Sequence, residues 1–541
     1  MKFFLETFQS ELQNTYIILF LIVIFSIIIK LILTDFSIPL TSDNLTYLLS
    51  AISFKNGDFS ELVDRSSGWS FFLFAFFQIF DSDDFFFYSN LTRILSIFVS
   101  SISIPFVYLL SRKFLKRSFS IISVCLFAFE PHLIYNATLG LSESLYSLSI
   151  ILSLYFLLMK DSRFLILSMI FVGISWWARI NGLLNIIPVL ITSLFLLKSQ
   201  HYIRNLFLGF LLMILVITPI LVQRYDQFGD PLYYFYSDKI FNNDLERMLS
   251  VNTHSESLTI IEYVDTKGIS SLIETYVYKG ITNITSTLIK ILFPCIIFLI
   301  PLGILFSISQ VIKKNFKIIP LWIFILISLF TMIITFSIVN ERRFLYHLYP
   351  VLIIISVFGL EKIFNTYFSE LLFFKKYKNI TLFTIAIIII LSSIIFTFNQ
   401  YTLIDKELEN EKFLFSQYLV NNLEGYILDD YDIELEYLQY ANITNDPQIF
   451  SNYKLSNFNG QNNFSLKTIR LYADSFEELI EIGKSYELNY IVSNEKIGKF
   501  HPYVDKLFYE HDKYQYLEKV FDSSEMGYQK LKIKVFKINY P

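Results

Sequence analysis

Long stretches of apolar residues, separated by short polar segments, run along the first 400 residues of the 541-residue chain. A helix needs about 20 mostly apolar residues to cross about 30 Å of hydrocarbon. Eleven stretches approach or reach this length: 16–34, 88–111, 118–137, 142–159, 164–178, 183–197, 205–224, 287–310, 318–340, 348–364 and 380–399. The pattern predicts a polytopic α-helical membrane protein with about eleven transmembrane helices.

The pattern changes after residue 400, where no further stretch is long enough to span. Residues 475–483 have helical spacing, and residues 488–493 and 531–538 have the character of strands. The sequence therefore predicts a membrane domain over residues 1–400 and a soluble α/β domain over residues 401–541.

Composition and charge support this division. Apolar residues make up 54% of the chain and charged residues 17%, whereas soluble domains carry about 25% charge. Too little polar surface is left to cover a soluble protein of this size, which excludes a cytosolic enzyme. Residues 401–541 hold 15 Lys and Arg against 23 Asp and Glu, a net charge of −8, and residues 1–400 hold the other 29 and 25, a net charge of +4. With no basic block, we expect no nucleic-acid partner.

Basic residues orient the predicted spans. Clusters of Lys and Arg follow the second, fourth, sixth, eighth and tenth spans; the clearest contains Arg112, Lys113, Lys116 and Arg117. Alternating spans place all these clusters on one side, which the positive-inside rule makes cytoplasmic. The prediction is a multi-pass cell-membrane protein with a cytoplasmic N-terminus. The C-terminal domain and the loops at about 35–87 and 225–286 are then extracytoplasmic.

The first external loop holds a candidate catalytic carboxylate. A helical pattern begins near Asp43, with Ser42 or Asp43 at the N-cap position. The apolar run after Gly68-Trp69 is about ten residues long, which is too short to span and predicts a helix lying in the membrane interface. Taken alone, Asp43 is most simply an N-cap.

Other charged residues occur at the same predicted level of the membrane. Glu143 opens the fourth span, Arg179 and Asn181 lie between two short spans, and Arg342 and Arg343 follow the ninth. Charges at the membrane edge are costly and indicate function. Carboxylates and guanidinium groups at one leaflet favour a site for an anionic ligand with a proton to remove. The alternative is a set of interfacial charges and helix caps.

These residues belong to six segments that, in their order, resemble the GT-C superfamily of glycosyltransferases, in its protein O-mannosyltransferase-like and aminoarabinose-transferase-like branch. The segments are Asp43 with Tyr47, the helix after Gly68-Trp69, Ser142-Glu143-Ser144, Arg179-Ile-Asn-Gly-Leu183, Phe228-Gly-Asp-Pro231 and Arg343-Phe-Leu-Tyr-His-Leu-Tyr-Pro350. They cover about residues 16–400.

The resemblance implies transfer of a sugar from a polyprenyl-phosphate donor to a protein, lipid or glycan acceptor at the extracytoplasmic face, with inversion expected. Asp43 would be the catalytic base and Glu143 a supporting carboxylate. The implied phosphate ligands are Arg179, Arg342 and Arg343, and the implied substrate contacts are Tyr47, Asn181, Tyr346 and His347. Many members carry an acidic pair where this chain has Asp43-Asn44, so a role for a divalent metal is left open.

Two other functions fit parts of the pattern. A secondary transporter would show two related halves with broken helices at matching positions. Here the short spans near Trp176 have no counterpart later in the chain. A lipid-linked polysaccharide polymerase or ligase would use the same type of donor, and the sequence does not separate it from a glycosyltransferase.

Overall fold

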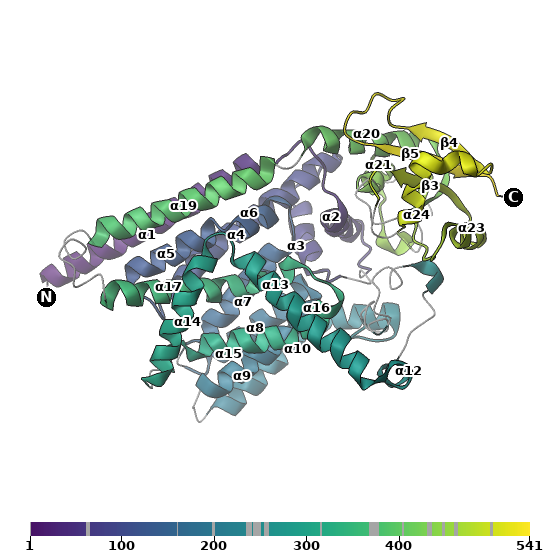
Figure 1. The fold of residues 1–541 in the computed structure, drawn as a ribbon. Coiled ribbons are helices and arrows are strands. Elements are labelled where there is room, and N and C mark those ends of the chain that lie inside the picture. The colour runs from purple at the N-terminus through teal and green to yellow at the C-terminus, as the bar shows by residue number, and fades with distance from the viewer. Residues whose placement is uncertain are drawn as a thin grey trace.

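The computed structural model shows a long bundle of helices with a small sheet at one end (Figure 1). It describes residues 2–60, 65–159, 161–196, 201–233, 241, 250–253, 259–313, 316–366, 378–402, 405–429, 435–445, 450–458, 464–497 and 501–540.

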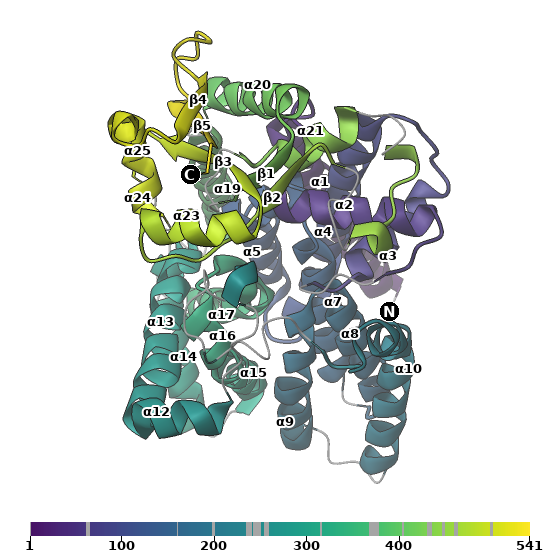
Figure 2. The same ribbon diagram turned by 90° about the vertical axis from the view of Figure 1, so that its right-hand side faces the viewer.

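The bundle is built from consecutive helices. Its first part contains α1 (Lys2–Leu33), α2 (Ser42–Lys55), α3 (Gly68–Phe77), α4 (Phe85–Ser111), α5 (Arg117–Ala128), α6 (Pro131–Thr138), α7 (Glu143–Leu157), α8 (Phe164–Ala178), η1 (Ile180–Asn185), α9 (Ile186–Leu196) and α10 (Tyr202–Phe228). Its second part contains η3 (Val251–Thr253), α12 (Ile260–Leu272), η4 (Ile273–Tyr278), α13 (Lys279–Leu292), α14 (Ile296–Ile312), η5 (Phe316–Ile318), α15 (Ile319–Thr331), α16 (Ile333–Ile338), η6 (Arg342–Leu348), α17 (Tyr349–Thr366) and α19 (Lys378–Thr402). Figure 2 shows α8, α9 and α10 on one side of the bundle and α12, α13 and α14 on the other.

Each predicted span falls on a helix or on a pair of consecutive helices. Within the described residues, five helical segments are long and apolar enough to cross a membrane, or up to seven if each of two bent pairs forms one span. The five are 15–33, 85–111, 202–228, 342–366 and 380–401. The chain therefore has the helices of a membrane protein, and the count of eleven stays a prediction because helices such as α7, α8 and α15 are shorter.

Two of the predicted spans bend sharply in the structure. The segment 118–137 bends by 47° between α5 and α6, and the segment 287–310 divides between α13 and α14, where the axis turns by 112°. A proline lies at each bend. Pro131 and Pro294 lack a backbone N–H, and proline disfavours helical conformation in the residue before it.

Glycines let α14 and α17 pack backbone to backbone. A Cβ atom at Gly359 would lie 2.5 Å from the carbonyl carbon of Leu302 and would also clash with the backbone of Gly303. A Cβ atom at Gly303 would lie 2.5 Å from the carbonyl oxygen of Ile355. Small residues allow this close approach between membrane helices. Since η6 leads directly into α17, this packing helps to fix the segment that carries Arg343.

Gly359→Ala should destabilise the protein by about 1–3 kcal/mol, because the added methyl group meets backbone that cannot rotate away. Thermal unfolding in detergent would measure the loss. Gly173→Ala is the matched control, since its Cβ atom would meet its nearest neighbours, which include side-chain atoms of Met213, at 3.3 Å. Equal stability of the two variants would contradict the packing argument.

The C-terminal part contains a five-stranded mixed sheet. Its strands are β1 (Gly425–Leu428), β2 (Leu466–Ile469), β3 (Leu488–Asn494), β4 (Leu517–Asp522) and β5 (Ile533–Ile538), in the order β2-β1-β3-β5-β4. β1 pairs in parallel with β2 and β3, and β5 pairs antiparallel with β3 and β4. Its helices are α20 (Lys406–Asn422), α21 (Leu438–Asn445), η9 (Leu455–Phe458), α23 (Phe476–Ser485), α24 (Pro502–Asp505), α25 (Leu507–Glu510) and η10 (His511–Lys513).

Alternating residues of the strands build a core on each face of the sheet. Ile427 and Val535 pack with α20 and α21, whereas their neighbours Leu428 and Phe536 pack with α23, α24 and α25. This is the period of two that a strand buried on both faces requires. The predicted helix at 475–483 and strands at 488–493 and 531–538 correspond to α23, β3 and β5. The domain boundary at residue 400 stays a prediction.

The C-terminal part packs against the segment between α1 and α4 (Figure 2). The ring of Phe85 at the start of α4 lies 4.9 Å from that of Tyr440 in α21. Asn56, which follows α2, donates hydrogen bonds to the carbonyl oxygens of Ser451 and Tyr453. Tyr440 and Tyr453 belong to the same buried cluster as residues of α2 and α3. α21 and the residues near Tyr453 therefore lie against the segment that carries Asp43.

Candidate functional site

Asp43 lies in the first turn of α2 between two arginines. Its Oδ1 atom is 2.8 Å from Nη2 of Arg65, and its Oδ2 atom accepts a hydrogen bond of 2.7 Å from Nη1 of Arg343. Arg65 comes from the same loop, whereas Arg343 lies 300 residues later in η6. The Asp43 side chain keeps 28% of its surface exposed. The carboxylate is thus held by two cations and remains open to solvent.

The start of α2 differs from the sequence prediction. Neither Ser42 nor Asp43 caps the helix: Thr41 occupies the N-cap position, and its side chain makes no capping hydrogen bond. The Thr41 hydroxyl group donates instead to Oε1 of Glu436 in the C-terminal part, at 2.5 Å. Ser42 has a φ of +51°, in the left-handed region that residues other than glycine rarely adopt. Strained residues of this kind concentrate at functional sites.

The environment of Asp43 keeps it ionised. Burial by itself would raise the pKa of this carboxyl group, but the nearby charges of Arg65, Arg343 and Arg179 outweigh it and lower the pKa to about 2. In this state Asp43 is a weak base that can hold a cationic or hydroxyl group. Any role in removing a proton needs a change in its surroundings.

A second ion pair lies next to the first. Glu143 begins α7 with only 2% of its side chain exposed, and it forms an ion pair with Arg179, whose guanidinium group lies over the ring of Phe344 at 5.2 Å. Nη1 of Arg343 lies 3.6 Å from Oε1 of Glu143. Arg343 therefore links the two carboxylates, and the ion pairs form a continuous chain: Arg65, Asp43, Arg343, Glu143 and Arg179.

A tight turn after α8 positions Arg179. Arg179 is the C-cap of α8, with an extended backbone, and η1 begins directly after it. A Cβ atom at Gly182 would clash with the backbone of Ser175 and Trp176, so the turn needs glycine here. This explains the Arg-Ile-Asn-Gly segment between the two short helices: the chain reverses within four residues and leaves the arginine facing Glu143.

Two of the predicted substrate contacts, Tyr47 and Asn181, adjoin this chain of charges. The ring of Tyr47 lies 5.9 Å from the guanidinium carbon of Arg65, and its hydroxyl oxygen accepts a 3.4 Å hydrogen bond from Ser142. Both polar atoms of the Asn181 side chain are buried and have no hydrogen-bond partner among the described residues. Buried amides are nearly always hydrogen-bonded, so Asn181 is available for a ligand.

Two further candidates, His347 and Arg342, both lie in η6 but differ in their surroundings. His347 is fully buried; its Nδ1 atom lies 3.0 Å from the carbonyl oxygen of Phe344, and its Nε2 atom has no partner in the described part of the chain. Arg342 is exposed, and no described carboxylate forms an ion pair with it. The structure therefore does not bring Arg342 into the chain of charges that contains Arg343.

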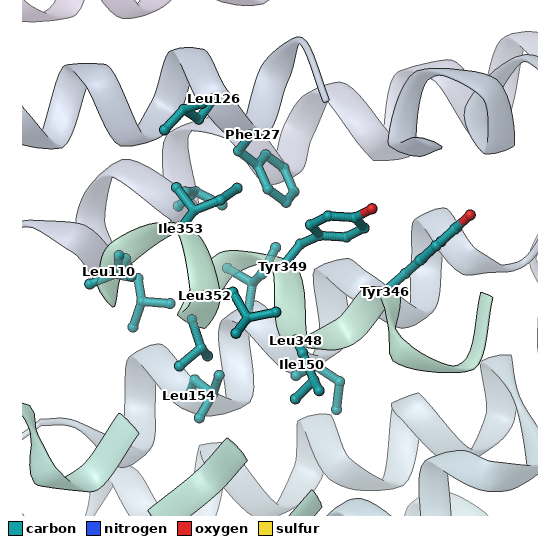
Figure 3. Close-up of a cluster of buried hydrophobic side chains, with 14 of the residues drawn as sticks. Leu110, Leu126, Phe127, Ile150, Leu154, Tyr346, Leu348, Tyr349, Leu352 and Ile353 are labelled. Carbon is teal, nitrogen blue, oxygen red and sulfur yellow. The ribbon is translucent and has the colours of Figure 1, made fainter. Parts of the chain in front are cut away.

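Tyr346 faces another group of residues. Its ring centroid lies 6.1 Å from that of His132 and 5.4 Å from that of Tyr349. In Figure 3 the hydroxyl groups of Tyr346 and Tyr349 point away from the aliphatic side chains of the cluster, which include Leu348 and Leu352. This buried cluster packs against η6 and so fixes the position of Arg343.

Sequence reasoning missed Arg65 and Glu436. The predicted loop 35–87 has only two cations, Lys55 and Arg65. This scarcity could have pointed to Arg65 as a partner for Asp43. Glu436 had none, because it belongs to the C-terminal part and reaches Thr41 only through tertiary packing.

The site residues do not fit a divalent cation. In the described ranges no group of three or more His, Cys, Asp or Glu side chains is placed to hold a metal ion. Both oxygens of Asp43 contact guanidinium groups, and Glu143 contacts Arg179 and Arg343.

Comparison with solved structures finds proteins with a similar architecture. The oligosaccharyltransferase of Archaeoglobus fulgidus in the apo form superposes with a TM-score of 0.55 at 12% identity, over 93% of this chain and 73% of that chain. ArnT from Cupriavidus metallidurans bound to undecaprenyl phosphate superposes with a TM-score of 0.51 at 10% identity, over 96% and 97% of the two chains. The chain has a GT-C fold. The predicted resemblance is thus confirmed for the fold.

Sequence comparison adds nothing to this relationship. No protein-family model matches the chain, and no curated protein is similar to it in sequence. At 10–12% identity the GT-C fold is visible in the three-dimensional arrangement of the helices and sheet alone.

Proposed function

We propose that this GT-C chain is a membrane glycosyltransferase that moves a sugar from a polyprenyl-phosphate donor to a hydroxyl group of a protein, lipid or glycan acceptor. The observation that carries the proposal is the chain of ion pairs around Asp43 and Glu143, formed by residues from the first loop, α7, the C-cap of α8 and η6. Two structures of the same fold contain related lipids: dolichol phosphate in the archaeal oligosaccharyltransferase AglB and undecaprenyl phosphate in ArnT.

The arginines suit the leaving group of this reaction. A polyprenyl phosphate that departs from the sugar carries negative charge, and guanidinium groups bind phosphate through paired hydrogen bonds. Three arginines lie along the chain of charges with two carboxylates, and Arg343 lies at its centre. Arg179 and Arg343 are the proposed phosphate ligands. The exposed Arg342 lies outside the chain of charges and would reach a phosphate only from the solvent-exposed surface.

The transfer needs one base. The acceptor oxygen forms a bond to the anomeric carbon on the face opposite the phosphate, and the carbon–oxygen bond to the phosphate breaks. The phosphate leaves with the electron pair, and the acceptor proton moves to Asp43. Attack from the opposite face inverts the anomeric configuration. Asn181, Tyr47 and His347 have polar atoms or rings close to this chain and are the proposed sugar contacts.

Donor binding would also activate Asp43. While Arg343 contacts Asp43, the pKa of that carboxyl group stays near 2 and the group is a weak base. A lipid phosphate competes for Arg343 and weakens its hold on Oδ2. The pKa of Asp43 then rises towards its ordinary value, and the carboxylate becomes a better proton acceptor once the donor is in place.

The direct test uses purified protein in detergent with undecaprenyl-phosphate-linked hexoses and pentoses as donors and a membrane extract as the acceptor source. Release of undecaprenyl phosphate with transfer of labelled sugar supports the proposal. A secondary transporter would move its substrate without breaking this bond. A polysaccharide polymerase or ligase would transfer preassembled chains and leave single-sugar donors intact, so product size separates it from a monosaccharide transferase.

We also propose the orientation and division that the basic clusters predict. The site and the C-terminal domain, residues 401–541, lie outside, and Lys116 and the N-terminus lie in the cytoplasm. The support is that the chain of ion pairs and the sheet occupy the same end of the bundle. Labelling of a cysteine placed at Asn452 in intact cells is expected, and labelling there only after permeabilisation would reverse the topology.

The C-terminal domain should hold the catalytic loop in place. Thr41 donates to Glu436 two residues before Asp43, and burial raises the pKa of Glu436, which favours a strong hydrogen bond. We expect Thr41→Val to lower kcat by about tenfold with little change in donor KM, since it loosens the loop without touching the phosphate ligands. Thr46→Val is the matched control, because Thr46 is one turn further along α2 and bonds only the carbonyl oxygen of Ser42. Equal rates in both variants would contradict the role of Glu436.

A further inference from the structure

A charged cavity lies at the opposite end of the bundle from Asp43. It has a volume of about 320 Å³, at the small end of the range for ligand pockets. The turn between α4 and α5, the end of α14 with η5, and the last turns of α17 line it. Its cationic and anionic lining residues are Arg112, Lys116, Lys317, Lys362 and Glu361.

The length of α4 separates this cavity from the proposed active site. α4 starts at Phe85, which packs on the C-terminal part, and ends at Ser111, directly before Arg112. Twenty-seven helical residues rise about 40 Å, close to the full thickness of a bilayer. The cavity therefore faces the membrane surface opposite the one where the sugar donor is proposed to react.

The charges around the cavity are unbalanced. Four cations line it with one carboxylate, Glu361, which is 93% buried. Glu361 accepts a hydrogen bond of 3.1 Å from the backbone nitrogen of Lys116, so it caps the start of α5. No described carboxylate forms an ion pair with the side chain of Arg112, Lys116 or Lys362. The rim is therefore positive.

The cavity has an apolar floor beneath this rim. Phe114, Leu115, Ile318 and Phe358 are all buried and line its wall. Ile308 and Ile312, which expose 53% and 76% of their surface, lie on the opposite side of α14 from the lining residue Gln310. A positive rim over an apolar floor matches a molecule with a phosphate headgroup and hydrocarbon chains.

We infer that this cavity binds the phosphate headgroup of an anionic phospholipid, with its acyl chains on the apolar outer surface of the bundle. Basic pockets between membrane helices at the cytoplasmic surface bind such headgroups. Ordinary positive-inside residues would also collect at this end, but they would not need to converge from three segments on one cavity. The shared chemistry is a phosphate group, which a lipid or free phosphate could supply, and the apolar features favour the lipid.

Native mass spectrometry of the full chain in detergent would test this inference, with dioleoyl-phosphatidylglycerol, dioleoyl-phosphatidylcholine and inorganic phosphate as separate probes. We expect one phosphatidylglycerol molecule to bind in preference to phosphatidylcholine. The triple variant Arg112→Gln, Lys116→Gln and Lys362→Gln should weaken this binding on the order of 100-fold, since each surface cation contributes about a fivefold effect.

The matched control removes three charges from the same predicted side and leaves the cavity intact: Arg163→Gln, Arg204→Gln and Lys313→Gln, none of which lines it. This control should bind phosphatidylglycerol like the wild type. If the cavity variant does not fold, Lys362→Gln alone should still weaken binding several-fold. Unchanged phosphatidylglycerol binding in the cavity variants, or equal loss in the control, would overturn the inference. If inorganic phosphate binds as tightly as the lipid, the cavity is a site for a soluble anion, and the assignment of a phospholipid is overturned.

Discussion

Asp43→Asn should reduce the rate of sugar transfer by about 10²–10⁴, the usual effect of removing a general base. The change keeps the shape of the side chain and removes its charge, so the proton acceptor is lost while the loop can keep its conformation. It leaves helix capping untouched, because Asp43 does not cap α2. Transfer of radiolabelled sugar by the purified variant would measure the loss.

Asp81→Asn is the matched control for this result. Asp81 lies in the same loop and forms an ion pair with a single lysine, Lys55, but it is 80% exposed and lies outside the chain of charges. We expect this variant to keep wild-type activity. If Asp43→Asn transfers sugar at a similar rate to Asp81→Asn, Asp43 is only a partner for Arg65 and Arg343, and Glu143 is the next candidate.

The pH dependence of stability gives an independent test of the ion pairs that Asp43 forms. Its pKa is about 2 in the folded protein, below the value of about 3.9 of an unfolded chain. The ion pairs therefore stabilise the fold above about pH 4, and this contribution is lost as the pH falls towards 2. The stability difference between wild type and Asp43→Asn should accordingly shrink from pH 7 to pH 3. A difference that stays constant over this range would contradict the assigned ion pairs.

Glu143→Gln should cost about 3–5 kcal/mol of stability, the range found when one partner of a buried ion pair is removed. Glu143 is 2% exposed and Arg179 is 12% exposed, so the arginine would keep its charge without solvent or its counter-ion. We expect a large drop in the thermal unfolding temperature in detergent together with loss of transfer. Glu341→Gln is the matched control, since Glu341 is 47% exposed and only approaches Arg343 at 3.6 Å.

A double variant separates the ion pair from the catalytic role of Glu143. Glu143→Gln with Arg179→Gln removes both charges, so it should lose less stability than the sum of the two single variants. Activity should remain low in the double variant, because Arg179 is also a proposed phosphate ligand. Strict additivity of the two stability losses would show that the pair does not interact as the structure places it.

Hydrophobic patterning predicted most of the helices because each apolar stretch is a local property of the chain. The stretches at 88–111, 205–224 and 380–399 each lie within one helix, and the strands predicted at 488–493 and 531–538 correspond to β3 and β5. Two stretches, 118–137 and 287–310, bend in the structure. Pro131 and Pro294 lie at these bends, and an average over an apolar window does not register a single proline.

The candidate site was predictable as a set of residue types and not as an arrangement. Asp43, Glu143, Arg179 and Arg343 could be selected because charges at the ends of apolar spans are costly. Which carboxylate faces which arginine could not be predicted, because Asp43 and Arg343 are separated by 300 residues and meet only through helix packing. Their catalytic roles stay predictions.

The sequence by itself determined that this protein is a membrane protein built from many apolar helices, with a C-terminal α/β part and its excess of carboxylates after residue 400. Those properties follow from local composition and periodicity. Only the tertiary structure decided that Arg65 joins Asp43, that Arg342 does not, and that Glu436 reaches Thr41. Ion pairs and hydrogen bonds act over about 3 Å, so they depend on how distant segments pack, and no local pattern in the chain encodes those contacts.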